Sequence, residues 1–430
     1  MPKALLSNRI YLEATPELRQ ALTKELTYVI PPRTKMGYPE TIRNLKPFKK
    51  NIVSIPIGRT DLIPKDYEIV DKRVINDVEF PDFKGVLRPS QQDIWDDIDD
   101  SAMINAWVSF GKTFTALAIA GKWSQKTLVV THTVQLRRQW EKEIEKVYGF
   151  TPGVIGSSKF ELDSPIVVAN VQTLYNHMDK LYKEFGCLIM DEFHHVSAPT
   201  FTKVIDKCSA RYKIGLSGTM QRKDGKHIVF KDYFGSQVYR PPVENFMPPE
   251  IHIYKTPITL PDSDLIPWAK KINTLSENEE YQHLLAILAA KYAAEGHKVL
   301  LVASRVKLLQ VCAELIGDNA TCVTGGSSEE ERQDSMDMIA AGEKEVLCGT
   351  QSMFSEGISL DELSCIVLGT PINNEPLLIQ LIGRIGRVCE GKKKPVVVDI
   401  GLRGNTAKKQ AAMRAGVYMK QGWDIKEDNV

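Results

Sequence analysis

The residues with the clearest chemistry are Gly111, Lys112 and Thr113, which follow a short apolar run at 103–104. An apolar stretch from 114 to 120 comes directly after them, so the order predicts a strand, a loop and a helix. In such a loop the backbone N–H groups and the positive helix end hold phosphates, a lysine adds charge, and a threonine hydroxyl binds Mg²⁺. Ordinary turns also contain Gly-Lys-Thr, so the triplet alone does not identify a phosphate site.

A second candidate site closes the apolar run 187–190, which ends in Asp191 and Glu192. A carboxylate at the end of a parallel strand beside a phosphate loop can hold Mg²⁺, and its neighbour can orient or deprotonate the attacking water. We therefore assign Thr113 and Asp191 to the metal and Glu192 to the water. A solvated acidic turn would explain an Asp-Glu pair alone, but two motifs at strand ends favour a site.

A third candidate is the run from Gln380 to Arg387, in which Arg384 and Arg387 flank a glycine-containing turn. An arginine that reaches a γ-phosphate stabilises the charge that develops during hydrolysis, and it makes hydrolysis depend on how two domains are placed. A basic turn that contacts nucleic acid is the alternative for whichever arginine does not reach the nucleotide.

Alternating strands and helices must position these motifs. We predict strands at 128–130, 166–168, 188–190, 214–216, 299–302, 345–348, 365–368 and 395–400, and helices at 284–292, 308–315 and 376–382. Such alternation predicts an α/β fold with two parallel-sheet lobes. The proline-dense stretch 240–250 excludes a helix or a central strand, so we expect a hinge there.

The first part of the chain reads as a small α+β module. It carries a basic cluster interleaved with Tyr38 and Phe48, which would either face duplex phosphates or form a solvated surface: Arg33, Lys35, Arg43, Lys46, Lys49 and Lys50. We expect four parts: an accessory, candidate duplex-binding domain at 1–84, a nucleotide-binding lobe at 85–242, a hinge and connector at 243–280, and a second lobe at 281–430. The basic tail from Thr406 would cap the second lobe or touch DNA.

Composition bounds the class of protein. The 430 residues are 43% hydrophobic and 25% charged, with a net charge of +1, which suits a protein with full cores and no global excess of cations. The seven cysteines show no C-x-x-C pair, which is typical of a reducing compartment. There is no signal peptide and no apolar run of about 18 residues, so we expect a soluble cytoplasmic protein without membrane contact.

The order of the motifs resembles that of the superfamily 2 helicases and translocases, from about Gly85 onward. Leu87 to Gln91 looks like the leading glutamine motif, 106–113 like motif I, 127–140 like motif Ia, 168–174 like motif Ib, 191–194 like motif II and 216–219 like motif III. Motifs IV, V and VI match 299–305, 346–358 and 380–387. The resemblance implies two RecA-like lobes that hydrolyse ATP with Mg²⁺.

The same resemblance implies roles for single residues. ATP contacts would come from Gln91, which reads adenine, and from Ala106, Gly111, Lys112, Thr113, Gly357 and Gln380. Backbone contacts to nucleic acid would come from Thr133, Gln172, Thr173, Ser304 and Thr350. Three positions depart from the family pattern: Ala106 replaces a glycine, Phe110 replaces a small residue, and Ser359 replaces an aspartate. His194 belongs to motif II in this comparison, and His195 is expected to be structural.

Within that superfamily, the chain looks most similar to phage DNA branch-migration helicases of the UvsW type. This implies a single-stranded tracking strand, forks and junctions as DNA partners, roles in recombination, replication or repair, and a monomer in the host cytoplasm. Two alternatives stay open. One is an RNA helicase, and the other is the DNA-dependent ATPase motor of a larger complex, such as a restriction complex, that does not unwind by itself.

Overall fold

The computed structural model describes residues 1–31, 38–193, 199–218, 226–263, 265–355 and 360–429. The chain forms two compact units, Met1–Val243 and Glu244–Val430. In the described ranges, every helix is too short or too polar to cross a membrane.

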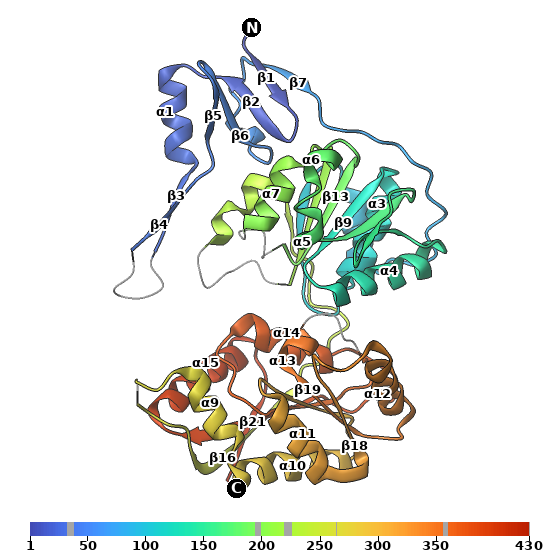
Figure 1. The fold of residues 1–430 in the computed structure, drawn as a ribbon, viewed down its shortest axis with the longest axis vertical. Helices are drawn as coiled ribbons and strands as arrows, with labels where there is room; N and C mark the ends of the chain where they lie inside the picture. The colour runs from blue at the N-terminus through green and yellow to red at the C-terminus, as the bar shows by residue number, and fades with distance from the viewer. Residues whose placement is uncertain (32–37, 194–198, 219–225, 264, 356–359, 430) are drawn as a thin grey trace. The chain divides into compact units, whose positions relative to one another are not determined.

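The first unit begins with an N-terminal module (blue in Figure 1). Its elements are β1 (Lys3–Leu6), β2 (Arg9–Glu13), α1 (Pro16–Glu25), β3 (Thr27–Ile30), β4 (Glu40–Arg43), β5 (Lys46–Lys49), β6 (Ile52–Pro56), the short 3₁₀ helix Thr60–Leu62 and β7 (Glu68–Asp71). Five strands form a sheet in the order β5-β6-β2-β1-β7, and β3 pairs with β4 in a separate two-stranded ribbon. Helix α1 starts where the Thr15 side chain accepts from Leu18 N, and it buries Leu22 against the sheet.

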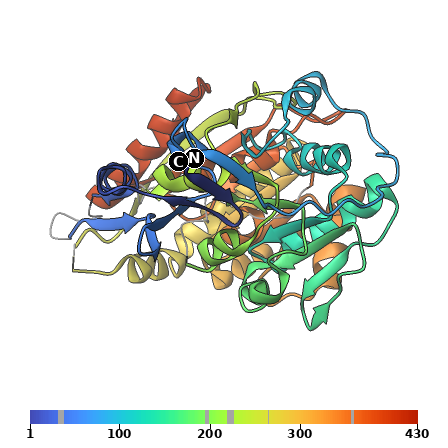
Figure 2. The ribbon, with the colours of Figure 1, turned by 90° about the horizontal axis from the view of Figure 1, so that it is seen from above.

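An extended linker joins this module to the first lobe. Figures 1 and 2 show it running along the outside of that lobe. Backbone hydrogen bonds hold the linker along its length, including Val74 N to Ser209 O, Val78 N to Ser124 O and Lys84 N to Val147 O. The module and the lobe are therefore parts of one unit.

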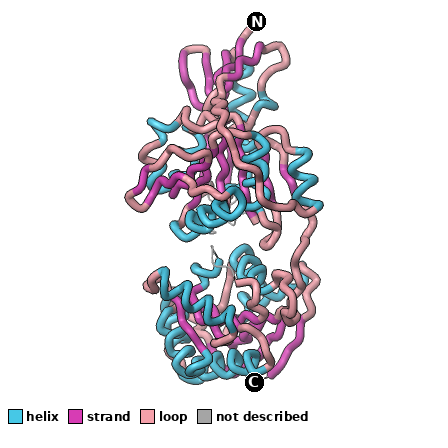
Figure 3. The backbone as a smooth tube through the Cα atoms, turned by 90° about the vertical axis from the view of Figure 1, so that its right-hand side faces the viewer, coloured by secondary structure: helices cyan, strands magenta, loops and turns pink. Residues whose placement is uncertain are grey.

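The first lobe is a RecA-like α/β layer. Its elements are α2 (Pro89–Asp97), β8 (Ala102–Asn105), α3 (Lys112–Trp123), β9 (Thr127–Thr131), α4 (Val134–Tyr148), β10 (Gly153–Gly156), β11 (Lys159–Phe160), β12 (Ile166–Asn170), α5 (Val171–Leu174), α6 (Met178–Leu181), β13 (Cys187–Asp191), α7 (Pro199–Lys207), β14 (Tyr212–Ser217), the 3₁₀ turn Lys226–Val229, α8 (Phe230–Phe234) and β15 (Val238–Tyr239). The sheet order is β11-β10-β12-β9-β13-β14-β8-β15, and its central strands are parallel. These strands are buried along their whole length because helices cover both faces, as Figure 3 shows.

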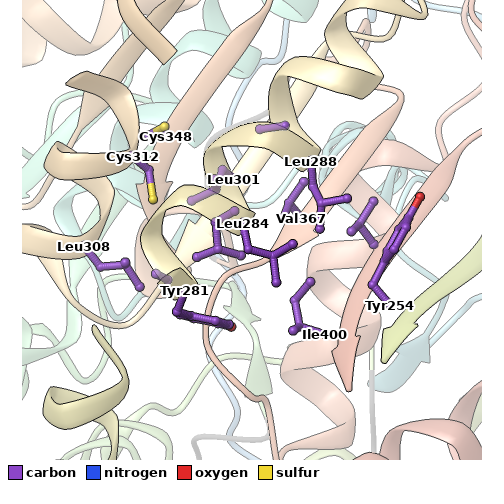
Figure 4. Packing of buried hydrophobic residues seen from close by; sticks show 14 of the residues in the cluster. Tyr254, Tyr281, Leu284, Leu288, Leu301, Leu308, Cys312, Cys348, Val367 and Ile400 are labelled. Carbon is purple, nitrogen blue, oxygen red and sulfur yellow. The ribbon is translucent and has the colours of Figure 1, made fainter. Parts of the chain in front are cut away.

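The second unit repeats this design. Its elements are β16 (Glu250–Thr259), α9 (Trp268–Ser276), α10 (Glu279–Ala294), β17 (Val299–Ala303), α11 (Val306–Ile316), the 3₁₀ turn Gly317–Asn319, β18 (Ala320–Val323), α12 (Glu329–Ala341), β19 (Val346–Thr350), α13 (Gln351–Ser355), β20 (Cys365–Leu368), α14 (Glu375–Ile385), β21 (Val396–Arg403), α15 (Asn405–Lys420) and β22 (Ile425–Asn429). Its seven strands are parallel in the order β18-β19-β17-β20-β21-β16-β22. Figure 4 shows its core, where α10 and α11 pack Leu284, Leu288 and Leu308 against strand residues such as Leu301 and Val367.

The strands and helices predicted for both lobes are observed, with ends shifted by a few residues. One assignment needs correction. Residues 250–259 were expected in the connector, but they form β16, which pairs with β21 on one side and β22 on the other. The segment is a strand because Tyr254, Ile258 and Leu260 bury their side chains in the core of the second unit.

The basic tail also has a defined place. Its helix α15 packs on the second lobe, and Arg414 donates from Nε and Nη2 to both oxygens of Asp399 at 2.8 Å. The hydroxyl of Tyr418 donates to the same carboxylate at 2.9 Å. A buried cation in this position is satisfied by a bidentate partner, so the helix caps the lobe through Arg414.

A buried lysine in the first lobe gives a stability prediction. The Lys213 side chain on β14 is 1% exposed, and in the described part of the chain its Nζ has no hydrogen-bond partner. Burial lowers the pKa of Lys213 to about 8. Below that pH the amine is protonated in both the folded and unfolded states, and desolvation of its charge destabilises the fold by roughly 3 kcal/mol. Between about 8 and the unfolded value near 10.5, the folded protein releases the proton first, so stability rises with pH.

We therefore expect Lys213→Met to raise the melting temperature at pH 7, and the gain to shrink as the pH approaches 10.5. Thermal unfolding of both proteins across this pH range measures the difference, with Lys142→Met on the exposed face of α4 as the control. A gain that does not change with pH would show that packing, rather than the buried charge, causes it.

Candidate functional site

The polar residues of the first lobe meet at one edge of its sheet. Strand register aligns Ser217 with Asn105, and Asn170 with Thr131. Asp191 lies one strand away from Ser217, opposite Leu216. The carboxyl ends of five parallel strands, β12, β9, β13, β14 and β8, therefore form one row, which is where α/β sheets bind their ligands.

The loop after β8 has the backbone of an anion site. Ser109 and Gly111 adopt left-handed φ angles of 77° and 82°, and Gly111 is the N-cap of α3. Glycine is required at 111, since an added Cβ would lie 2.8 Å from Nε2 of Gln91. The 12-residue helix α3 directs its N-terminal N–H groups toward this loop.

Lys112 is the first residue of α3. Its Nζ donates to the carbonyl of Ala106 at 3.1 Å, at the start of the loop. An added Cβ on Gly218, just beyond β14, would lie 3.7 Å from the same Nζ. The amine is thus held over the loop, where a phosphate would receive its charge, and the half-buried Thr113 follows it.

The two unusual loop residues do not obstruct the site. The Phe110 side chain is 1% exposed and packs in the core of the lobe with Ile94 and Ala116. Its backbone carbonyl accepts hydrogen bonds from Arg88 and from Gln91. Ala106 is also buried, and its N–H donates to Ser217 O at 3.0 Å.

Gln91 is held between the leading motif and the loop. Its Nε2 donates to Phe110 O at 2.7 Å, and its Oε1 accepts from Arg88 N at 2.9 Å. The side chain is 2% exposed. The structure therefore shows Gln91 fixing the loop, and its contact with adenine stays a prediction.

Asp191 ends β13 as a buried carboxylate. Trp140 Nε1 donates to Oδ2 at 2.8 Å, and Glu192 N donates to Oδ1 at 2.9 Å. Burial raises the pKa of Asp191 to about 6, and the neighbouring charge of Glu192 adds to the effect, while Lys112 opposes it. A carboxylate destabilised in this way suits a divalent cation, because each oxygen keeps a lone pair for a ligand bond. The residues present therefore fit Mg²⁺.

Glu192 has a strained backbone with a φ of 48°, which costs a non-glycine residue on the order of 1–3 kcal/mol. The next residue anchors it. Phe193 is fully buried, with its ring 4.8 Å from that of Phe230 and 5.3 Å from that of Phe234. A Cβ on Gly215 would lie 2.9 Å from Phe193, so the ring fills the space that this glycine leaves.

The proposed nucleic-acid contacts of the first lobe lie at the same sheet edge. Thr133 is the N-cap of α4, where its hydroxyl accepts from Leu136 N at 3.2 Å. Gln172, at the start of α5, donates from Nε2 to His132 O at 3.1 Å and joins the two loops. Thr173 is half-buried beside it.

In the second unit, Ser304 and Thr350 follow neighbouring strands. Register pairs Ala303 of β17 with Thr350 of β19, so the two polar residues lie side by side at the carboxyl edge. Ser304 is exposed, and its N–H donates to Thr370 Oγ1 at 3.0 Å. Both residues are accessible to a strand that passes along this edge.

The arginine run forms the end of α14 in the second unit. Arg384 Nε donates to Phe354 O at 3.1 Å, and Arg387 Nη1 donates to Asp361 Oδ1 at 2.8 Å. Gly386 is packed tightly, since an added Cβ would lie 2.0 Å from the ring of Phe246. Gln380 is half-buried on the same helix. The turn that carries Arg387 is therefore rigid, with an acid already beside the guanidinium.

Some expected residues lie outside the described residues: Arg33, Lys35, His194, His195, Thr219, Gly357, Ile358 and Ser359. One residue of the site had no role assigned from sequence. Trp140 was part of a matched motif, but its spacing with Leu136 and Ile144 is only that of a buried helix face. Its bond to Asp191 is a tertiary contact across 51 residues, which no local pattern signals.

Comparisons with known proteins fit this geometry. Two family models match the chain: "Type III restriction enzyme, res subunit" over residues 84–222, and "Helicase conserved C-terminal domain" over 279–389. The "Probable helicase D10" of Escherichia phage T5 is 42% identical over 98% of this chain and 95% of its own length. The "ATP-dependent DNA helicase uvsW" of Enterobacteria phage T4 is 22% identical over 75% of this chain and 70% of its own. The solved structure of S. cerevisiae Dbp5 bound to RNA and ADP BeF3 has a TM-score of 0.55 at 14% identity and covers 80% of this chain and 89% of its own, which supports the two-lobe fold.

Proposed function

The chain belongs to the superfamily 2 helicases, which hydrolyse ATP to act on nucleic acid, and from that premise we propose that its substrate is DNA, which it unwinds or branch-migrates at forks and junctions. The T4 relative supports this choice, because its name identifies it as a DNA helicase. Roles in recombination, replication or repair, action as a monomer and a place in the host cytoplasm belong to the same proposal.

The observation that carries the proposal is the row of polar residues at the carboxyl edge of each sheet. In the first unit the row contains the phosphate loop, Asp191 and the loops of Thr133 and Gln172. In the second it contains Ser304 and Thr350. A nucleotide site and a strand-binding edge built on the same strand ends allow ATP turnover to move the loops that hold nucleic acid.

The nucleotide would be held mainly by the loop of the first unit. The N–H groups at the start of α3 and the amine of Lys112 would bind the β- and γ-phosphates. Mg²⁺, held by Thr113 and Asp191, would offset phosphate charge when bound. Glu192 would orient the attacking water and accept its proton. Gln91 and Ala106 keep this loop in place.

The second unit would contribute Arg387. Its guanidinium pairs with Asp361 in the structure, with 22% of the Arg387 side chain exposed. We propose that a γ-phosphate competes with this carboxylate during turnover, and that Arg384 is the alternative group. Gly357 and Gln380 stay predicted nucleotide contacts.

A basic groove on the N-terminal module supports duplex binding. Its volume is about 750 Å³, and it is lined by one face of α1 and by Arg43 of β4. The cations in this lining are Arg19, Lys24 and Arg43, and none of its residues is acidic. In the described residues no ion pair engages these three cations, whereas Lys46 of the basic cluster pairs with Asp206 at 2.7 Å. A groove of this charge suits a phosphodiester backbone.

We expect the triple variant Arg19→Ala, Lys24→Ala and Arg43→Ala to bind duplex and forked DNA more weakly. The slope of log affinity against log salt should fall by roughly 0.9 for each lost phosphate contact. Fluorescence anisotropy over a salt series measures this slope. The control is Lys3→Ala, which removes an exposed lysine that pairs with Glu68 on the same module. An unchanged slope would show that this groove is a solvated surface that does not contact DNA.

Two alternatives are tested together with the proposal. The first alternative is an RNA helicase, and the Dbp5 structure of similar fold contains RNA. The second is the motor of a larger complex, and one matching family model is named for a restriction subunit. Steady-state ATPase would be measured with no nucleic acid, single-stranded DNA, duplex, a four-way junction and a matched RNA. Stimulation by branched DNA is the expected result, and stimulation by RNA alone would overturn the choice of DNA.

A further inference from the structure

Side chains of the N-terminal module bind a buried carboxylate of the first lobe, that of Asp232. Asp232 on α8 is fully buried, and its Oδ1 accepts from the hydroxyl of Tyr28 at 2.8 Å. Its Oδ2 accepts from Asn44 Nδ2 at 2.6 Å, and Arg59 Nη1 donates to Oδ1 at 3.4 Å. Three side chains of the module thus converge on a single buried group. Two of them belong to the β3–β4 ribbon or adjoin it: Tyr28 lies on β3, and Asn44 directly follows β4.

The backbone of the module also contacts the backbone of α8 directly. Gly58 N donates to the carbonyl of Asp232 at 2.9 Å. An added Cβ on Gly58 would lie 2.3 Å from Lys231 O and 2.6 Å from Gly235 N. Packing of this kind leaves no room for the module to slide over α8, so a movement of the module would carry α8 with it.

The opposite side of α8 packs against Phe193, the residue that follows Glu192. Phe230 and Phe234 flank Asp232 in sequence, and both rings pack against Phe193. Phe193 follows Glu192, whose left-handed backbone is strained at a φ of 48°. A continuous series of contacts therefore runs from Tyr28 and Asn44 through α8 to Glu192.

We propose that Asp232 is a positioning residue through which nucleic acid held by the N-terminal module controls ATP hydrolysis at Glu192. The proposal rests on the proposed function, since it requires that the module binds nucleic acid. A shift of α8 by the module would turn Phe193 and move the Glu192 carboxylate relative to the attacking water. Two discrete positions of α8 would give the coupling its physical basis.

The test is Asp232→Asn, which keeps the size of the side chain and removes the charge that Tyr28, Asn44 and Arg59 bind. We expect stimulation of ATPase by forked DNA to fall at least fivefold, whereas basal turnover, the KM for ATP and the affinity for DNA stay within twofold of wild type. A loss of stimulation with binding intact separates control of hydrolysis from a role in binding or in folding. Equal losses in basal and stimulated turnover, or unchanged stimulation, would overturn the proposal.

Two further variants keep the test decisive. Tyr28→Phe removes one hydrogen bond to Asp232 and keeps the ring, so it should lower the stimulation of ATPase by a smaller factor. If Asp232→Asn does not fold, unchanged stimulation in Tyr28→Phe overturns the proposal. Ile10→Val removes a buried methylene from the core of the module, in a cluster that contains no residue of α8, and should lower thermal stability without changing stimulation. If RNA rather than DNA stimulates the wild type, the choice of DNA fails, and the coupling is measured with RNA.

Discussion

Lys112→Ala is expected to abolish ATP turnover, with kcat reduced by at least roughly 10³-fold. The reason is positional. The amine begins α3 and is held by Ala106 O at 3.1 Å, where a phosphate on the loop would receive its charge. In the described part of the first lobe, the other lysine of that helix, Lys122, donates instead to backbone carbonyls of Trp95 and Ile98 and cannot replace it.

Steady-state ATPase with saturating forked DNA measures the effect, and circular dichroism shows whether the variant folds. Lys142→Ala on α4 is the control, because it removes an exposed lysine from the same lobe. DNA-dependent ATPase retained in Lys112→Ala would show that the phosphate loop is not the nucleotide site.

Arg387→Ala is expected to leave ATP binding intact and to slow hydrolysis roughly 10³-fold or more, as for other arginines that act on a transferring phosphoryl group. Binding should survive because, in the proposed site, the loop of the first unit would hold the phosphates. Hydrolysis suffers because the lost guanidinium would act only on charge that develops in the transition state. Single-turnover hydrolysis, with the affinity for a fluorescent ATP analogue measured separately, distinguishes the two steps.

Asp361→Asn is the matched control for Arg387→Ala, because it disrupts the same ion pair from the acidic side. It removes the carboxylate that holds Arg387 at 2.8 Å, and it should change hydrolysis far less than loss of the arginine itself. A decrease below tenfold in Arg387→Ala would transfer the role to Arg384, whose Nε is held by Phe354 O. If neither arginine mattered, the second unit would not take part in hydrolysis.

The two lobes were predictable because their strands are continuous apolar runs. Stretches such as 166–168 and 299–302 are buried on both faces, so composition alone marks them. The polar residues at their ends follow from the same pattern. In contrast, β16 begins at the end of the proline-dense stretch 240–250 and contains Pro257, two features that are typical of a connector. Its place in the sheet depends on pairing with β21 and β22, which lie far along the chain.

The environment of single side chains was harder to predict. Phe110 looked like an obstruction in the phosphate loop, and only tertiary packing shows that its ring lies in the core. The residues that bind Asp232 lie at least 173 positions away from it in the sequence, and Arg59 is the nearest of them. A buried hydrogen-bond network between a module and a lobe has no period or local motif, so sequence reasoning could not find it.

Strand displacement tests the central claim most directly. A labelled strand would be followed on a fork, on a four-way junction and on a matched RNA duplex, with wild type and Lys112→Ala, in the presence of ATP or a non-hydrolysable analogue. The account predicts that only the wild type releases the DNA strand, and only when ATP can be hydrolysed. ATP hydrolysis stimulated by DNA without displacement, or displacement of RNA alone, would contradict it.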